Sequence, residues 1–111
     1  MNRDNRFPQV VCLCGSTRFT TTFNEWRKRL TYEGKIVLSI EFVTSQSMDT
    51  DPQYVAPDLK AMLDELHLRK IDLADEVMIL NVGGYIGEST MREILYAKNI
   101  GKRIKYLEGE R

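Results

Sequence analysis

Apolar residues gather in four short runs along the chain, and these runs predict β-strands. The runs cover residues 9–14, 35–43, 76–82 and 103–107. The first and third hold few polar residues, which is typical of strands that are covered on both faces of a sheet. A sheet with a buried centre is therefore expected.

Between the runs, apolar residues recur three or four positions apart and predict helices over residues 19–33, 57–72 and 90–99. Gly34 and Gly101 follow the first and last of these segments, where a glycine commonly ends a helix. The stretch 44–56 is polar and lacks periodicity. It predicts a long loop of the kind that often forms a lid or binds a ligand.

Strands and helices of these lengths alternate along a single domain, residues 1–111. The alternation predicts an α/β fold with three layers: a doubly wound, mainly parallel sheet of four to five strands, flavodoxin-like or Rossmann-like. Ligands of such sheets bind beyond the carboxyl ends of the strands. Two glycine-containing stretches, residues 14–18 and 83–90, follow strands and are expected at that edge.

The amino-acid composition argues against nucleic acid and membranes as binding partners. The chain is 42% hydrophobic and 29% charged, and its 16 basic residues balance 16 acidic ones. A neutral chain has no overall field to attract nucleic acid or an anionic membrane. The chain opens on a polar stretch, and no apolar segment approaches the ~20 residues of a membrane span. We therefore expect a cytoplasmic domain that binds neither nucleic acid nor membrane.

The cysteines and the single histidine do not indicate a metal site. Cys12 and Cys14 are one residue apart, a spacing that fits neither a zinc knuckle nor a redox Cys-x-x-Cys pair. We interpret them as small buried residues on one face of a strand. His67 lies beside the apolar stripe of the second helix, with neither a second histidine nor a suitably spaced cysteine. The prediction is no metal.

The first loop contains Gly15, Ser16, Thr17 and Arg18. Gly15 permits a tight turn, the two hydroxyls and the amides of the next helix can bind a phosphate, and Arg18 can add a bidentate contact. Alternatively, Ser16 or Thr17 only caps the helix while Arg18 lies on the surface. The residues alone leave both interpretations open.

The second loop, residues 83–90, also precedes a helix, and Glu93 follows one turn later. Glu93 is either a functional carboxylate or the partner of Thr90 in a capping box. Tyr85 either walls a base-binding pocket or covers the end of the sheet. These alternatives also remain open at the level of single residues.

Together the two segments resemble a known family. The stretch "CGSTRF" resembles the Gly-Ser-x-Arg phosphate loop of the deoxynucleoside 5′-monophosphate N-glycosidases. Residues 73–104 resemble the ending shared by the nucleoside 2-deoxyribosyltransferase superfamily. The features in common are Ala74-Asp75, Gly83 to Gly87, Glu93, Ala97 and Gly101-Lys102.

The resemblance implies an enzyme that cleaves or transfers at the N-glycosidic bond of a nucleotide, a nucleoside 5′-monophosphate, with no metal or organic cofactor. It makes Glu93 the nucleophile that attacks the sugar. It also implies a homo-oligomer, a dimer or larger. The substrate-binding residues would be Gly15, Ser16, Thr17, Arg18, Gly84, Tyr85, Gly87, Ser89 and Arg92.

Two positions depart from the family pattern. His67 stands where the family keeps a second catalytic aspartate, so it either acts as the general acid or marks a lost or changed reaction. The alternative function is accordingly a non-catalytic nucleotide-binding sensor or regulatory module of the same fold. Arg92, directly before Glu93, is expected to keep that carboxylate ionised and to contact the substrate phosphate.

Overall fold

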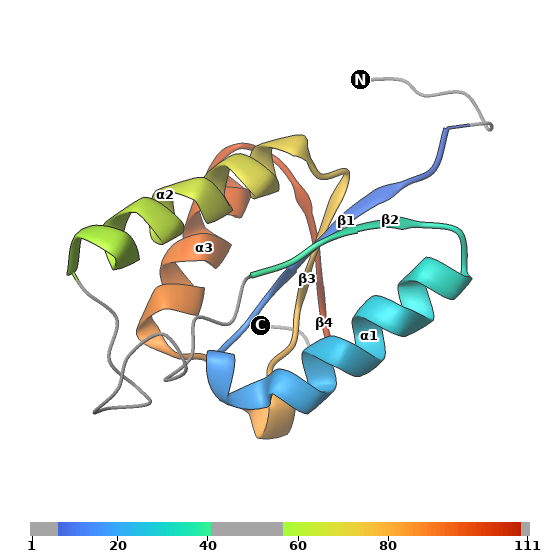
Figure 1. Ribbon diagram of the computed structural model, residues 1–111, viewed down its shortest axis with the longest axis horizontal. Helices are drawn as coiled ribbons and strands as arrows, with labels where there is room; N and C mark the ends of the chain where they lie inside the picture. Colours follow the sequence, from blue (N-terminus) through green and yellow to red (C-terminus); the bar gives the residue numbers. More distant parts are fainter. Residues whose placement is uncertain (1–6, 41–56, 110–111) are drawn as a thin grey trace.

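Four parallel strands form the sheet of the described chain, which comprises residues 7–40 and 57–109 of a computed structural model (Figure 1). The strands are β1 (Val10–Cys14), β2 (Ile36–Leu38), β3 (Glu76–Ile79) and β4 (Arg103–Tyr106), in the order β2-β1-β3-β4. Every residue of β1 and β3 is buried, as the apolar runs predict.

Helices cover both faces of this sheet (Figure 1). A single 3₁₀ turn, η1 (Thr17–Phe19), leads into α1 (Thr20–Tyr32) on one face. The helices α2 (Pro57–Leu73) and α3 (Glu88–Asn99) lie on the other face. Another 3₁₀ turn, η3 (Val82–Gly84), follows β3. The predicted three-layer, doubly wound α/β fold is confirmed, and the arrangement is Rossmann-like or flavodoxin-like.

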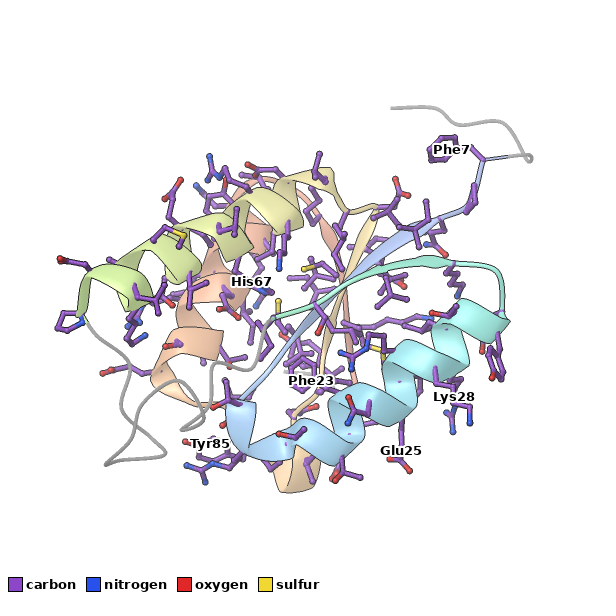
Figure 2. The ribbon with its side chains drawn as sticks, viewed as in Figure 1. Phe7, Phe23, Glu25, Lys28, His67 and Tyr85 are labelled. Carbon is purple, nitrogen blue, oxygen red and sulfur yellow. The ribbon has the colours of Figure 1, made fainter. Side chains whose placement is uncertain are left out.

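Alternate residues of the central strands supply two separate cores because successive side chains of a strand point to opposite faces. On the face of α1, Val11 and Leu13 belong to one cluster with Phe23 and Leu30 of the helix. Figure 2 shows Phe23 directed from α1 toward the sheet. This core fixes α1, and with it the loop that connects β1 to the helix.

On the opposite face, Cys12 and Cys14 belong to a cluster that includes Ile71 of α2 and Ile94 of α3. Both cysteines are completely buried, so the prediction that they lie as small core residues on one strand face is confirmed. The packing of α2 and α3 against the same strand face also brings residues of the two helices close to the cysteines.

The strand order places a topological switch point between β1 and β3. The chain leaves β1 through α1 to reach β2 on one side, then crosses back through α2 to β3 on the other. The two strands pair directly, from Val11 opposite Glu76 to Cys14 opposite Ile79. The loops after β1 and after β3 therefore start side by side, where ligands of such sheets bind.

Several element boundaries differ from those predicted. The second strand, expected over 35–43, ends at Leu38, and residues 39 and 40 are not in a strand. Residues 41–43 and the expected loop 44–56 lie outside the described residues. Helix α3 starts at Glu88, two residues earlier than expected. Among the described helices, none is both long and apolar enough to span a bilayer.

The Phe23 core is expected to account for a large part of the stability of the fold. Phe23 is fully buried, whereas Tyr32 on the same helix is 79% exposed. Phe23→Ala should lower the free energy of unfolding by about 3–5 kcal/mol, because it removes buried area and leaves a cavity. Tyr32→Ala should change it by less than about 0.5 kcal/mol. Urea unfolding followed by circular dichroism measures both, and equal effects would contradict this assignment of the core.

Candidate functional site

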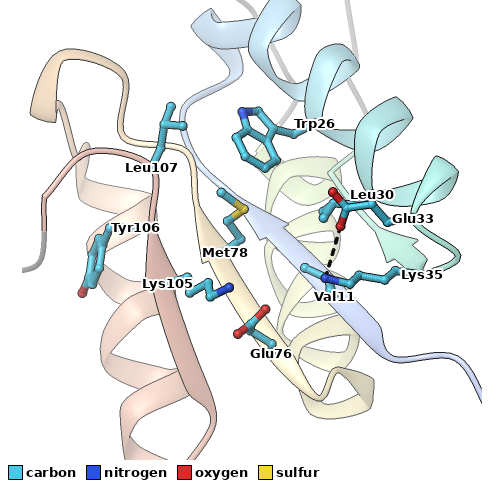
Figure 3. Close-up of a pocket in the computed structure, with 10 residues that line it drawn as sticks. All are labelled: Val11, Trp26, Leu30, Glu33, Lys35, Glu76, Met78, Lys105, Tyr106 and Leu107. Atoms are coloured by element: carbon cyan, nitrogen blue, oxygen red, sulfur yellow. Dashed lines mark ion pairs between the residues drawn. The ribbon is translucent and has the colours of Figure 1, made fainter. Parts of the chain in front are cut away.

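A pocket beside α1 does not contain the predicted site residues. It lies between α1 and the sheet and is lined by residues that include Trp26, Met78 and Lys105 (Figure 3). The cysteine side chains and His67 belong to the other face of the sheet. The predicted site residues therefore lie outside this pocket.

The first loop is shaped by a close approach at Gly15. A Cβ atom at this position would lie 3.2 Å from the carbonyl oxygen of Leu80 and 3.3 Å from the ring of Phe23. The oxygen belongs to the backbone after β3, so a larger residue would push the two strand ends apart. Gly15 thus keeps the two loops of the switch point adjacent.

Ser16 caps the turn that follows. Its Oγ accepts a hydrogen bond of 3.2 Å from the backbone amide of Arg18, and the Oγ of Thr20 donates to the carbonyl oxygen of Thr17. Of the two interpretations of this loop, the capping role of Ser16 is the one seen in the structure. The cap belongs to η1, because α1 itself begins at Thr20 without a side-chain cap.

Arg18 and Tyr85 join the two loops. The guanidinium of Arg18 lies 4.2 Å from the centre of the Tyr85 ring and donates a hydrogen bond of 3.2 Å to its hydroxyl group. Phe19 meets the same ring edge-on, with the ring centres 5.9 Å apart. A Cβ atom on Gly87 would lie 3.1 Å from the Tyr85 hydroxyl oxygen, so Gly87 leaves space for the ring. These contacts place a cation over an aromatic ring at the outer edge of the switch point.

The amides of Gly83 and Gly84 in the second loop already have hydrogen-bond acceptors, and that of Gly83 is an anion. The Gly83 amide donates a hydrogen bond of 2.7 Å to the Glu108 carboxylate, and the Gly84 amide donates to the carbonyl oxygen of Asn81. Buried Asn81 exchanges two further hydrogen bonds with the backbone of Glu108. A phosphate at the Gly83 amide would have to displace this carboxylate, so the first loop is the better anion site.

Glu93 is not part of a capping box. Helix α3 begins at Glu88 with Gly87 at its N-cap, so Thr90 lies inside the first turn and is buried. Within the described part of the chain, the Oε1 atom of Glu93 has no hydrogen-bond partner although it is shielded from solvent. A buried oxygen without a hydrogen-bond partner costs stability, so the contacts that bear on the role of this carboxylate are the ion pair with His67 and a hydrogen bond with the Cys14 side chain.

The expected effect of Arg92 on Glu93 is wrong. Arg92 donates a hydrogen bond of 3.2 Å to the Ser89 hydroxyl and lies 3.9 Å from the Glu88 carboxylate. It is directed along the surface of α3. Instead of being held ionised, Glu93 has a pKa raised above its usual value because burial disfavours the charged form, and protonated His67 counteracts this only partly.

His67 and Glu93 face each other across the two helices. The His67 Nε2 atom lies 3.8 Å from the Glu93 Oε1 atom, and both side chains are largely buried. Figure 2 shows His67 lying between α2 and the sheet. A histidine at the position of the expected catalytic aspartate is thus brought beside the expected nucleophile.

Both cysteines adjoin the same histidine nitrogen. The His67 Nε2 atom lies 3.2 Å from the Cys14 Sγ atom and 3.8 Å from the Cys12 Sγ atom. The reason for excluding a metal, that no suitably placed cysteine accompanies His67, is therefore wrong. The useful signal was the i, i+2 spacing, which directs both thiols to the strand face that the second helix covers.

The clustered groups change one another's proton affinity. A hydrogen bond with Cys14 and the nearby His67 lower the Cys12 pKa to about 6, although burial alone would raise it. The same hydrogen bond, together with burial, raises the Cys14 pKa. Burial disfavours charged His67, but Cys12 and Glu93 outweigh it and raise the His67 pKa above its usual value. The cluster favours a charged imidazole among acidic groups.

Two residues of the family-like ending have structural roles at the opposite edge of the sheet. The Asp75 carboxylate accepts a hydrogen bond of 2.8 Å from the Val10 amide at the start of β1. The Lys102 ammonium donates to the carbonyl oxygens of Asp72 and Ala74. Both residues tie the amino ends of the strands together, far from the switch point.

Most of the predicted residues form two groups, whereas Gly84, Ser89 and Arg92 belong to neither: the Gly84 amide bonds to Asn81, and Arg92 pairs with Ser89 and Glu88 on α3. One comprises the first loop with Tyr85 and Gly87, and the other comprises His67 and Glu93 with the two cysteines. Cys14 immediately precedes Gly15, so the two groups meet at the end of β1. No hydrogen bond or ion pair of the described residues links Arg18 to Glu93. Comparison with protein-family models and with curated protein sequences finds no match for this chain.

The contact between Glu93 and His67 has a measurable consequence. Glu93→Met removes a charge that helps to raise the His67 pKa, so this pKa should fall. NMR titration of the single histidine measures the change, and Glu88→Gln on the exposed start of α3 is the control that should leave the His67 pKa unchanged. A Glu93 that only caps the helix predicts no change in either variant.

Proposed function

We propose that this protein cleaves the N-glycosidic bond of a nucleoside 5′-monophosphate, with Glu93 as the nucleophile. The observation that carries the proposal is the pair formed by Glu93 and His67. Their facing atoms lie 3.8 Å apart next to the carboxyl end of β1, and Glu93 Oε1 is shielded without a hydrogen-bond partner. Buried carboxylates whose pKa is perturbed are frequent at catalytic sites.

The chemistry requires one group on each side of the scissile bond. As the bond between C1′ and the base nitrogen breaks, its electrons go to the base, which takes the Nε2 proton of His67. A carboxylate oxygen of Glu93 attacks C1′ and forms a glycosyl ester. Water then hydrolyses this ester, or, in a transfer reaction, a second base displaces Glu93 from C1′. In retaining glycosidases the two groups are about 5 Å apart, so the entering sugar must separate this pair.

Recognition of the 5′-phosphate is assigned to the first loop. Arg18, the middle residue of η1, carries the positive charge at this edge, and α1 begins two residues later at Thr20. Tyr85 holds the guanidinium in place by stacking and by its hydroxyl group. The second loop is less suitable because Glu108 occupies the Gly83 amide.

The resemblance extends the proposal to a homo-oligomer. Helices α2 and α3 expose apolar side chains that a partner would cover: Leu66 is 46% exposed and Leu95 is 58% exposed. Burial of such residues in a symmetric interface would stabilise a small domain. The proposed assembly is a homodimer or a larger closed form.

Base release tests the catalytic assignment. A panel of nucleosides and nucleoside 5′-monophosphates is incubated with the protein, and the free base is separated by chromatography. Glu93→Gln should reduce the rate at least about 10³-fold because the nucleophile is lost, and His67→Gln roughly 10²- to 10⁴-fold because the leaving base lacks its proton. Glu88→Gln is the matched control on the same helix.

The outcomes separate the two candidate functions. Release by the wild type that disappears in Glu93→Gln supports the enzyme. Binding of a 5′-monophosphate without base release contradicts the catalytic proposal and leaves the nucleotide-binding module. Absence of nucleotide binding contradicts both.

The phosphate assignment has its own test. Arg18→Gln should lower kcat/KM for the 5′-monophosphate about 10- to 100-fold, the loss expected for a charged hydrogen bond. The same change should leave the rate with the corresponding nucleoside unchanged. Lys28→Gln, on the exposed side of α1, provides the control. Equal losses with nucleoside and nucleotide would contradict a phosphate contact.

A further inference from the structure

Two thiols and an imidazole converge at a point that the proposed reaction uses only in part. Cys12 and Cys14 are free, completely buried thiols, and His67 is 4% exposed. The two sulfur atoms and one nitrogen of His67 lie within 4.8 Å of one another. The glycosidic mechanism needs His67 and Glu93 but gives the thiols no task.

The two distances from His67 Nε2 to the cysteine sulfur atoms are close to those between the ligands of a tetrahedral zinc ion. Bonds of about 2.3 Å to sulfur and about 2.0–2.1 Å to nitrogen place a sulfur and a nitrogen ligand about 3.6 Å apart. The two observed separations from His67 Nε2 are 3.2 Å and 3.8 Å. The three side chains therefore need only small shifts to bind one ion.

The Glu93 carboxylate is the candidate for a fourth ligand, although it does not belong to the group of three atoms that all lie within 4.8 Å of one another and would have to move toward them. The Glu93 Oε1 atom lies 3.8 Å from the same histidine nitrogen and has no hydrogen-bond partner among the described residues. A bound divalent cation would give this oxygen a partner and would offset two of the three negative charges of the two thiolates and the carboxylate in an apolar core.

We propose that Cys12, Cys14 and His67 form a binding site for a divalent ion of the zinc type, with Glu93 as the fourth ligand. Two thiolates and an imidazole favour zinc over magnesium or calcium, which prefer a shell of oxygen ligands. Binding releases the thiol protons because the thiolate is the ligand.

The metal-site proposal does not rest on the proposed reaction, although the site and the reaction would share His67 and Glu93. An ion that holds His67 Nε2 and Glu93 removes both the proton donor and the nucleophile. Loading with zinc would therefore inhibit base release, and a chelator would restore it. The binding test below is read optically, so its result does not depend on whether the chain is an enzyme.

Cobalt(II) serves as the spectroscopic probe for zinc. The full chain, reduced and stripped of metal by a chelator that is then removed, is titrated with Co²⁺. One equivalent should produce sulfur-to-cobalt charge-transfer absorption in the near ultraviolet and the strong visible bands of tetrahedral cobalt, and Zn²⁺ should abolish both. Cys14→Ala and His67→Gln should each weaken binding more than about 10- to 100-fold, the loss typical of residues that only support a ligand.

Controls keep the result interpretable if a variant does not fold. Circular dichroism reports the fold of each variant, and Asp64→Asn, an exposed carboxylate on α2, is the matched substitution that should bind normally. Independently of any variant, X-ray absorption of the zinc-loaded wild type should show two sulfur neighbours at about 2.3 Å. Absence of one-equivalent binding, or a coordination shell without sulfur, would overturn the proposal.

Discussion

The parallel pairing of β1 with β3 is the constraint on which the site depends. These strands are distant in sequence, are buried on both faces, and are matched residue for residue up to Cys14 and Ile79. Because the pairing fixes where both strands end, it also fixes where the two following loops begin. The Leu80 amide donates a hydrogen bond of 2.8 Å to the Cys14 carbonyl oxygen and ties the two strand ends together, while Gly15 leaves room for the Leu80 carbonyl oxygen.

The same pairing makes the two faces of the sheet chemically different. The face under α1 is filled by aliphatic and aromatic side chains around Phe23. The face under α2 and α3 includes two thiols, and His67 and Glu93 join them there. Polar groups in a core cost stability unless they are paired, so the second face is packed at a higher cost than the first. Both proposals developed above concern this face.

The fold could largely be predicted from the sequence, because the strand runs and helical spacings are strong and agree with one another. The site could be predicted only in part. Sequence spacing identified Glu93 and Arg18, but the meeting of His67 with Cys12 and Cys14 depends on how α2 lies across β1, which periodicity does not encode. The capping-box alternative required α3 to start at Thr90. The helix starts two residues earlier, at Glu88, so Thr90 lies inside it and cannot be the cap.

The carboxylate of Glu108, which accepts the hydrogen bond of the Gly83 amide, also affects selectivity. Two glycine-containing loops begin side by side at the switch point, and both precede helices. Because the carboxylate of Glu108 binds the Gly83 amide, the proposed phosphate contact falls to Arg18 in the first loop. Under that proposal, the segment after β4 would set the side from which a charged ligand approaches, although it contributes no residue to the proposed chemistry.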